Sequence, residues 1–121
     1  MRSTAAKGND ALFGEGGDDA VEGAAGDDAL EGGRGADILR GDDGNDKLNG
    51  GFDSDQLFGG AGDDKLNGGF DSDQLFGGAG DDEINGIDGA ADQITCGPGF
   101  DSVTTDRLDP LLDARACESV N

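Results

Sequence analysis

Aliphatic side chains recur at every ninth position along most of this chain, with mostly polar or small residues between them. In Lys47-Leu48-Asn49 and Lys65-Leu66-Asn67 a leucine stands between two polar residues, the alternation typical of a half-buried β-strand. The period therefore predicts a series of three-residue strands, each pointing one aliphatic side chain into a common interior. These positions are Leu12, Val21, Leu30, Leu39, Leu48, Leu57, Leu66, Leu75 and Ile84.

Aspartate and glycine follow the same nine-residue period. The unit reads Gly-Gly-x-Gly-x-Asp-x-U-x, where U is aliphatic, and residues 59–67 are a complete copy. Each unit divides into a six-residue turn and a three-residue strand, because glycine permits left-handed backbone and leaves carbonyl groups uncovered. The unit is ten residues long once, between Gly86 and Thr95, so that its aspartate and aliphatic residue are Asp92 and Ile94.

This nonapeptide resembles the calcium-binding repeat of the RTX (repeats-in-toxin) family, over roughly residues 5–104. The resemblance implies a parallel β-roll that binds calcium in its glycine-rich turns. Residues 46–63 also recur unchanged as residues 64–81, which suits a coil in which two nonapeptides make one full turn. Such an unchanged copy is compatible with a recent duplication and with an engineered consensus roll.

We therefore expect an all-β fold, a parallel β-roll (β-solenoid) with two narrow sheets and two aliphatic ladders. Residues 1–4 are expected to be a disordered tail, 5–104 the roll and 105–121 a short C-terminal cap, in which 109–116 could form a helix. Side chains at equal positions two units apart should stack outside the roll, as Phe52 on Phe70, Phe58 on Phe76, and a row of asparagines. The ladders are Leu12, Leu30, Leu48, Leu66 and Ile84 on one side, and Val21, Leu39, Leu57, Leu75 and Ile94 on the other.

The same stacking brings the aspartates of every second unit together, and so forms two columns. Carboxylates about 5 Å apart repel each other unless a cation lies between them. Calcium fits such a gap, because it takes 6 to 8 oxygen ligands from carboxylates and backbone carbonyls, and we expect about eight Ca²⁺ ions. The predicted ligands are Asp10, Asp19, Asp28, Asp37, Asp46, Asp55, Asp64, Asp73, Asp82, Asp92 and Asp101, with carbonyls of Gly50, Gly59, Gly60, Gly62, Gly68, Gly77, Gly78 and Gly80.

Asp53 and Asp71 stand where the fourth-position glycine of the unit is expected. Aspartate tolerates left-handed backbone better than most residues, so both could be turn variants. The alternative interpretation is an extra carboxylate ligand in that column.

The composition agrees with a cation-dependent fold. The 121 residues carry 28 Asp and Glu against 8 Lys and Arg, a formal charge of −20, and such a chain without bound cations is expected to be unfolded. The charge also excludes nucleic acid and anionic membranes as partners, and no apolar run is long enough for membrane insertion. We expect calcium ions as partners, an unknown protein partner and a monomeric state.

The two cysteines, Cys96 and Cys117, could be free buried thiols, but we expect a disulfide that joins the last turn of the roll to the cap in an oxidising compartment. Zinc lacks its preferred ligands, since the chain contains no histidine. No nucleophile with a base and no phosphate-binding loop is recognisable, so no catalytic residue and no enzyme activity are predicted.

The predicted function is that of a secreted, extracellular calcium-binding module that folds into a rigid roll where calcium is plentiful. The alternative is a non-catalytic domain of a larger secreted enzyme or adhesin. The first residues, 1–7, lack the apolar stretch of a signal peptide. We therefore expect an export signal to lie elsewhere in a longer parent or to be missing from this sequence.

Overall fold

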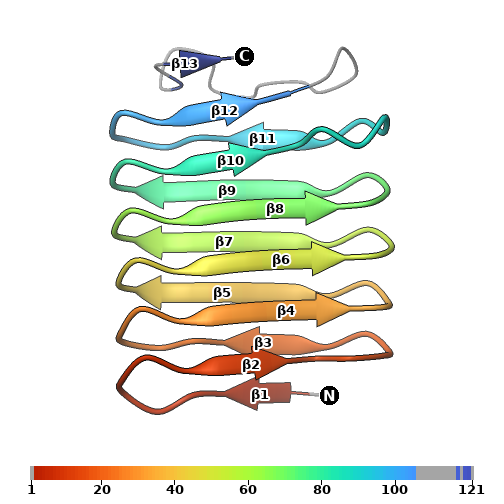
Figure 1. Cartoon of the computed structure of the whole chain (residues 1–121), viewed down its shortest axis with the longest axis vertical. Coiled ribbons are helices and arrows are strands. Elements are labelled where there is room, and N and C mark those ends of the chain that lie inside the picture. The colour runs from red at the N-terminus through yellow and green to blue at the C-terminus, as the bar shows by residue number, and fades with distance from the viewer. Residues whose placement is uncertain (1, 106–116, 118, 121) are drawn as a thin grey trace.

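The chain coils into a parallel β-solenoid of about six turns in the computed structural model, which describes residues 2–105, 117 and 119–120 (Figure 1). Successive strands alternate between two sheets that run along the length of the molecule. One sheet contains β1 (Arg2–Thr4), β3 (Ala20–Glu22), β5 (Ile38–Asp43), β7 (Gln56–Ala61), β9 (Gln74–Ala79) and β11 (Gln93–Thr95). The other contains β2 (Ala11–Phe13), β4 (Ala29–Gly33), β6 (Lys47–Gly51), β8 (Lys65–Gly69), β10 (Glu83–Asn85), β12 (Ser102–Thr104) and β13 (Ser119–Val120).

The pairing of the strands confirms the predicted roll with two nonapeptides per turn. Leu48 pairs with Leu66 in one sheet and Leu57 with Leu75 in the other, so each aliphatic residue meets its equivalent from the second unit along the chain. The middle strands are longer than predicted, because pairing continues into the turns, where Gly60 pairs with Gly78.

Both predicted aliphatic ladders lie inside the roll. Leu39, Leu57, Leu75 and Ile94 are fully buried, whereas Leu12 at the N-terminal end is only partly buried. Outside, the predicted stacks also form: the ring centroids of Phe52 and Phe70 are 5.1 Å apart, and those of Phe58 and Phe76 are 4.7 Å apart. The asparagine row is in register as well, at Asn49, Asn67 and Asn85.

The extra residue of the ten-residue unit is accommodated in the turn between β10 and β11. Across this turn, Leu75 still pairs with Ile94 and Ile84 with Val103, although the extra residue lengthens the chain between the partners. A slip within a strand would turn its aliphatic side chain outward, so the insertion has to be absorbed where the backbone is irregular.

The expectation of a disordered tail at residues 1–4 is wrong for residues 2–4. Arg2–Thr4 form β1 and pair with β3, and the Arg2 guanidinium lies 3.6 Å from the Glu22 carboxylate. This short segment lacks the repeat motif, but an open sheet edge offers backbone hydrogen bonds to any extended segment that reaches it.

At the C-terminal end, β13 pairs with β12 and extends the seven-stranded sheet. The predicted disulfide between Cys96 and Cys117 is present, with the two Cα atoms 5.5 Å apart. The helix expected over 109–116 falls outside the described residues, so the boundary of the cap stays a prediction. Within the described part of the chain, no helix could cross a membrane.

Candidate metal sites in the turns

The predicted aspartates form two columns, one along each row of turns. Each of them stands directly before a strand, and those from Asp19 to Asp101 are at most 4 % exposed. The first column, before strands of the seven-stranded sheet, is Asp10, Asp28, Asp46, Asp64, Asp82 and Asp101. The second, before strands of the six-stranded sheet, is Asp19, Asp37, Asp55, Asp73 and Asp92.

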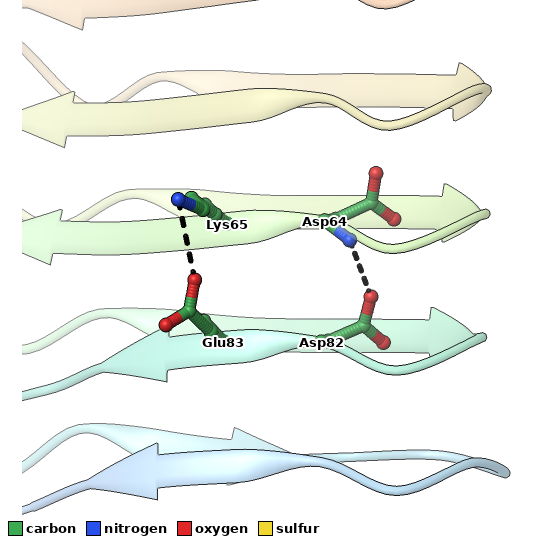
Figure 2. A network of polar contacts seen from close by, with 4 residues as sticks. All are labelled: Asp64, Lys65, Asp82 and Glu83. Atoms are coloured by element: carbon green, nitrogen blue, oxygen red, sulfur yellow. Dashed lines mark hydrogen bonds and ion pairs between the residues drawn. The ribbon is translucent and has the colours of Figure 1, made fainter.

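Backbone hydrogen bonds link each column from turn to turn. The N–H of Asp64 donates to Oδ1 of Asp82 at 2.8 Å, next to the exposed pair of Lys65 and Glu83 (Figure 2). The same bond joins Asp73 to Asp92 and Asp82 to Asp101. Both columns therefore continue across the register slip, and Asp101 extends the first one.

The second carboxylate oxygen, Oδ2, has a different environment. In much of both columns it is buried and accepts no hydrogen bond from any residue that the structure describes. A buried charged oxygen without a partner is costly, so these oxygens require either a proton or a cation. Such oxygens belong to Asp10, Asp28, Asp37, Asp46, Asp55, Asp64 and Asp73.

A backbone carbonyl oxygen of the next turn accompanies the carboxylate oxygen in most turns. A Cβ atom placed on Gly59 would lie 2.5 Å from the Gly77 carbonyl oxygen and 2.6 Å from Asp64 Oδ2. The same arrangement recurs at Gly32, where the two oxygens belong to Gly50 and Asp37. Two hard oxygen ligands thus converge on a point that any side chain would fill.

A profile of the RTX calcium-binding nonapeptide repeat matches the chain four times, over residues 4–30, 22–57, 58–90 and 68–103. The chain belongs to the RTX calcium-binding repeat family. No match to a curated protein was found. The RTX roll is thus a calcium-binding repeat module, and repeats of this family form a structural domain type rather than a catalytic one.

The donors of the RTX turns fit calcium. Carboxylate and carbonyl oxygens are the ligands that Ca²⁺ accepts in flexible geometry, whereas Mg²⁺ requires near-ideal octahedral geometry and retains its water. Zinc prefers cysteine and histidine, and both cysteines are in the disulfide.

The predicted glycines serve two different purposes in the RTX roll. Gly60, Gly62, Gly78 and Gly80 have φ between 91° and 117°, so the left-handed backbone selects glycine. Their nearest neighbours include the backbone one turn earlier, not the aspartate columns. Gly50, Gly59, Gly68 and Gly77 have no left-handed φ and are required because a Cβ would collide with an aspartate oxygen.

Asp53 and Asp71 adopt φ of 71° and 73°, as expected for turn variants at a glycine position. The Oδ2 atom of Asp53 accepts the N–H of Gly35, and that of Asp71 accepts the N–H of Asp53. These exposed carboxylates therefore act as backbone acceptors, which favours the turn-variant interpretation.

In the absence of metal, burial raises the pKa of Asp55, Asp64, Asp73 and Asp82 in the RTX roll. The pKa rises to about 7 for Asp55 and Asp64 and to about 8 for Asp73 and Asp82, and neighbouring carboxylates add to the effect of burial. The hydrogen bond from the preceding turn acts in the opposite direction. Without a cation, these groups hold protons near neutral pH.

These shifts predict an unusual pH dependence. Between about pH 4 and pH 8 the metal-free roll binds more protons than the unfolded chain, because the pKa of these four aspartates is 3.8 in the unfolded chain and higher in the roll. Its stability therefore increases as the pH falls through this range, while protons compete with calcium. Far-ultraviolet circular dichroism of metal-free protein should show more β structure at pH 5 than at pH 8, and calcium-induced folding should need more calcium at pH 5. More β structure at pH 8 than at pH 5 in the metal-free protein would contradict the assigned burial.

Sequence reasoning missed a third row of side chains, at the fifth position of every second unit. Oδ1 of Asn45 accepts the N–H of Asp63, and Oδ1 of Asp63 accepts the N–H of Asp81. The signal was present, since every eighteenth residue from Asn9 to Asp81 is Asn or Asp. These exposed groups stabilise the stacking of the turns beside the first aspartate column.

Proposed function

We propose that this RTX chain is a secreted calcium-binding module that folds into a rigid roll by binding several Ca²⁺ ions between its stacked turns. The observation that carries the proposal is a repeated pair of oxygens at one point, as at Asp64 and Gly77. One is a buried aspartate Oδ2 that accepts no hydrogen bond from the described residues, and the other is a backbone carbonyl oxygen. One cation between each two neighbouring aspartates of a column would neutralise carboxylate charge and occupy the space that glycine leaves open.

The proposed ligands are the aspartates of the two columns and the carbonyl oxygens of the turn glycines. Carbonyls of Gly50, Gly59, Gly68 and Gly77 are the strongest glycine candidates, because each lies beside an aspartate Oδ2. Those of Gly60, Gly62, Gly78 and Gly80 are further candidates for completing a sphere of 6 to 8 oxygens. Where bound, calcium would supply the positive charge that holds neighbouring turns together.

Charge explains why folding and binding should be one process. A compact roll with a formal charge of −20 repels itself, whereas about eight Ca²⁺ ions would reduce the formal charge to about −4. Metal binding then becomes folding free energy, because the unfolded chain has no preformed site. Extracellular calcium modules bind with dissociation constants of about 10⁻⁴ to 10⁻³ M, so such a chain would stay unfolded at low cytosolic calcium and fold after export.

Counting bound ions tests this proposal. Metal-free protein dialysed against millimolar CaCl₂ should bind about eight Ca²⁺ ions per chain at pH 7.5, measured by atomic emission. An equal concentration of Mg²⁺ should leave far fewer ions bound. A stoichiometry of one or two Ca²⁺ ions, or equal uptake of Mg²⁺, would contradict a ligand role for the two columns.

A further inference from the structure

The register slip brings a third carboxylate to one pair of column aspartates. Asp88 belongs to the ten-residue unit, between β10 and β11. Within the described part of the chain, only Asp73, Asp88 and Asp92 place three acidic ligand oxygens within 4.8 Å of one another.

Buried oxygens at this cluster independently indicate a ligand. Asp73 is 1 % exposed; its Oδ1 accepts the N–H of Asp55, and its Oδ2 has no hydrogen-bond partner among the described residues. The two oxygens of Asp88 also differ: Oδ1 accepts the N–H of Ala90 at 2.8 Å, while Oδ2 is buried and accepts no hydrogen bond from the described chain. In both side chains, Oδ1 is thus held by a backbone hydrogen bond, and Oδ2 is left for a cation.

The turn that precedes this cluster also differs from its neighbours. At Gly50 and Gly59 the three atoms closest to a hypothetical Cβ include a carbonyl oxygen of the next turn. At Gly68 all three belong to Asp73. At Asp73 the carbonyl oxygen of the next turn is therefore not among the closest atoms, as it is in the regular turns.

We propose that Asp73, Asp88 and Asp92 form a three-carboxylate cation site that binds Ca²⁺ more tightly than the regular turns. The inference rests on the proposed function, since Asp73 and Asp92 belong to the second column. Calcium affinity depends on the number of charged ligands, and the third carboxylate adds one negative charge. Because the attraction scales with the charge of the ion, the site also prefers a trivalent lanthanide to Ca²⁺.

A matched pair of charge-neutralising variants of the full chain tests the inference. Asp88→Asn removes one charge and retains an acceptor for the Ala90 N–H. Asp63→Asn removes one charge from an exposed residue, and Asn45 already occupies an equivalent position of the same row. Calcium titrations in competition with a chromophoric chelator resolve the tightest binding step of each protein.

Asp88→Asn should weaken the tightest step by at least about tenfold, since even partners outside the coordination sphere change metal affinity by about 10–100-fold. Asp63→Asn should leave it within about twofold of the wild type, as expected for a screened surface charge. Equal affinities of the two variants would overturn the inference while calcium-induced folding, and with it the proposed function, still stands. A wild-type chain that shows no calcium-induced folding would instead overturn the proposed function.

A second measurement needs no variant. Eu³⁺ added at half an equivalent to the wild-type chain is excited directly, because the chain has no Trp or Tyr to sensitise it. The transition between two non-degenerate levels gives one excitation line per europium environment. One dominant excitation line would support a single preferred site. Several lines of similar intensity would mean several equivalent sites and would overturn the inference.

Discussion

Replacing Gly59 by alanine should strongly impair calcium-induced folding. The added Cβ would stand 2.5 Å from the Gly77 carbonyl oxygen and 2.6 Å from Asp64 Oδ2, at the point where a cation is proposed to bind. Overpacking alone costs about 1–3 kcal/mol, and loss of two ligand positions adds to it. We expect the calcium concentration at the folding midpoint to rise by at least about tenfold, measured by far-ultraviolet circular dichroism.

Gly16→Ala is the matched control for this substitution. Gly16 has no left-handed φ, and a Cβ on it would meet no atom of the described residues within 4 Å. The control should therefore fold at the calcium concentration of the wild type. If Gly59→Ala also folded at that concentration, the Gly77 carbonyl oxygen and Asp64 Oδ2 would not form a calcium site at this turn.

Asp64→Asn should remove about two bound calcium ions and raise the folding midpoint by at least about tenfold. Asp64 lies between Asp46 and Asp82 in the first column, so it borders two of the proposed sites. The asparagine oxygen can still accept the N–H of Asp46, but the amide nitrogen replaces the buried Oδ2 and cannot bind a cation. Equilibrium dialysis measures the loss of ions, and circular dichroism measures the midpoint.

The adjacent variant Asp63→Asn provides the control, because it makes the same change in net charge on an exposed side chain. It should bind as many ions as the wild type. Equal losses in the two variants would mean that overall charge, not position in the column, governs calcium binding.

The roll was predictable from sequence because its determinants are local and repeated. A nine-residue period with one aliphatic residue per unit fixes which side chains face inward, so both ladders and the outer Phe stacks could be assigned. The two aspartate columns followed from the same spacing, including Asp92 after the slip. The strand at Arg2–Thr4 lies nine residues before β2, but it contains no aliphatic residue, so the residue pattern did not indicate it.

Two features of the sites required three-dimensional structure. The sequence alone does not show why Gly59 and Gly60 are both glycine. In the structure, Gly59 leaves no room for a Cβ, whereas Gly60 has a left-handed φ of 99°. The approach of Asp88 to Asp73 and Asp92 depends on how the ten-residue unit absorbs its extra residue. Because Asp88 lies outside the nine-residue period, the repeat pattern could not assign it to a metal site.

A calcium titration followed by far-ultraviolet circular dichroism, starting from metal-free protein at neutral pH and with Mg²⁺ as the control, tests the central claim most directly. We expect a cooperative change from an unfolded to a β spectrum near millimolar Ca²⁺, and no such change with Mg²⁺. A β spectrum that is already complete in excess chelator would contradict the claim, because the roll would then fold on its aliphatic ladders and disulfide alone.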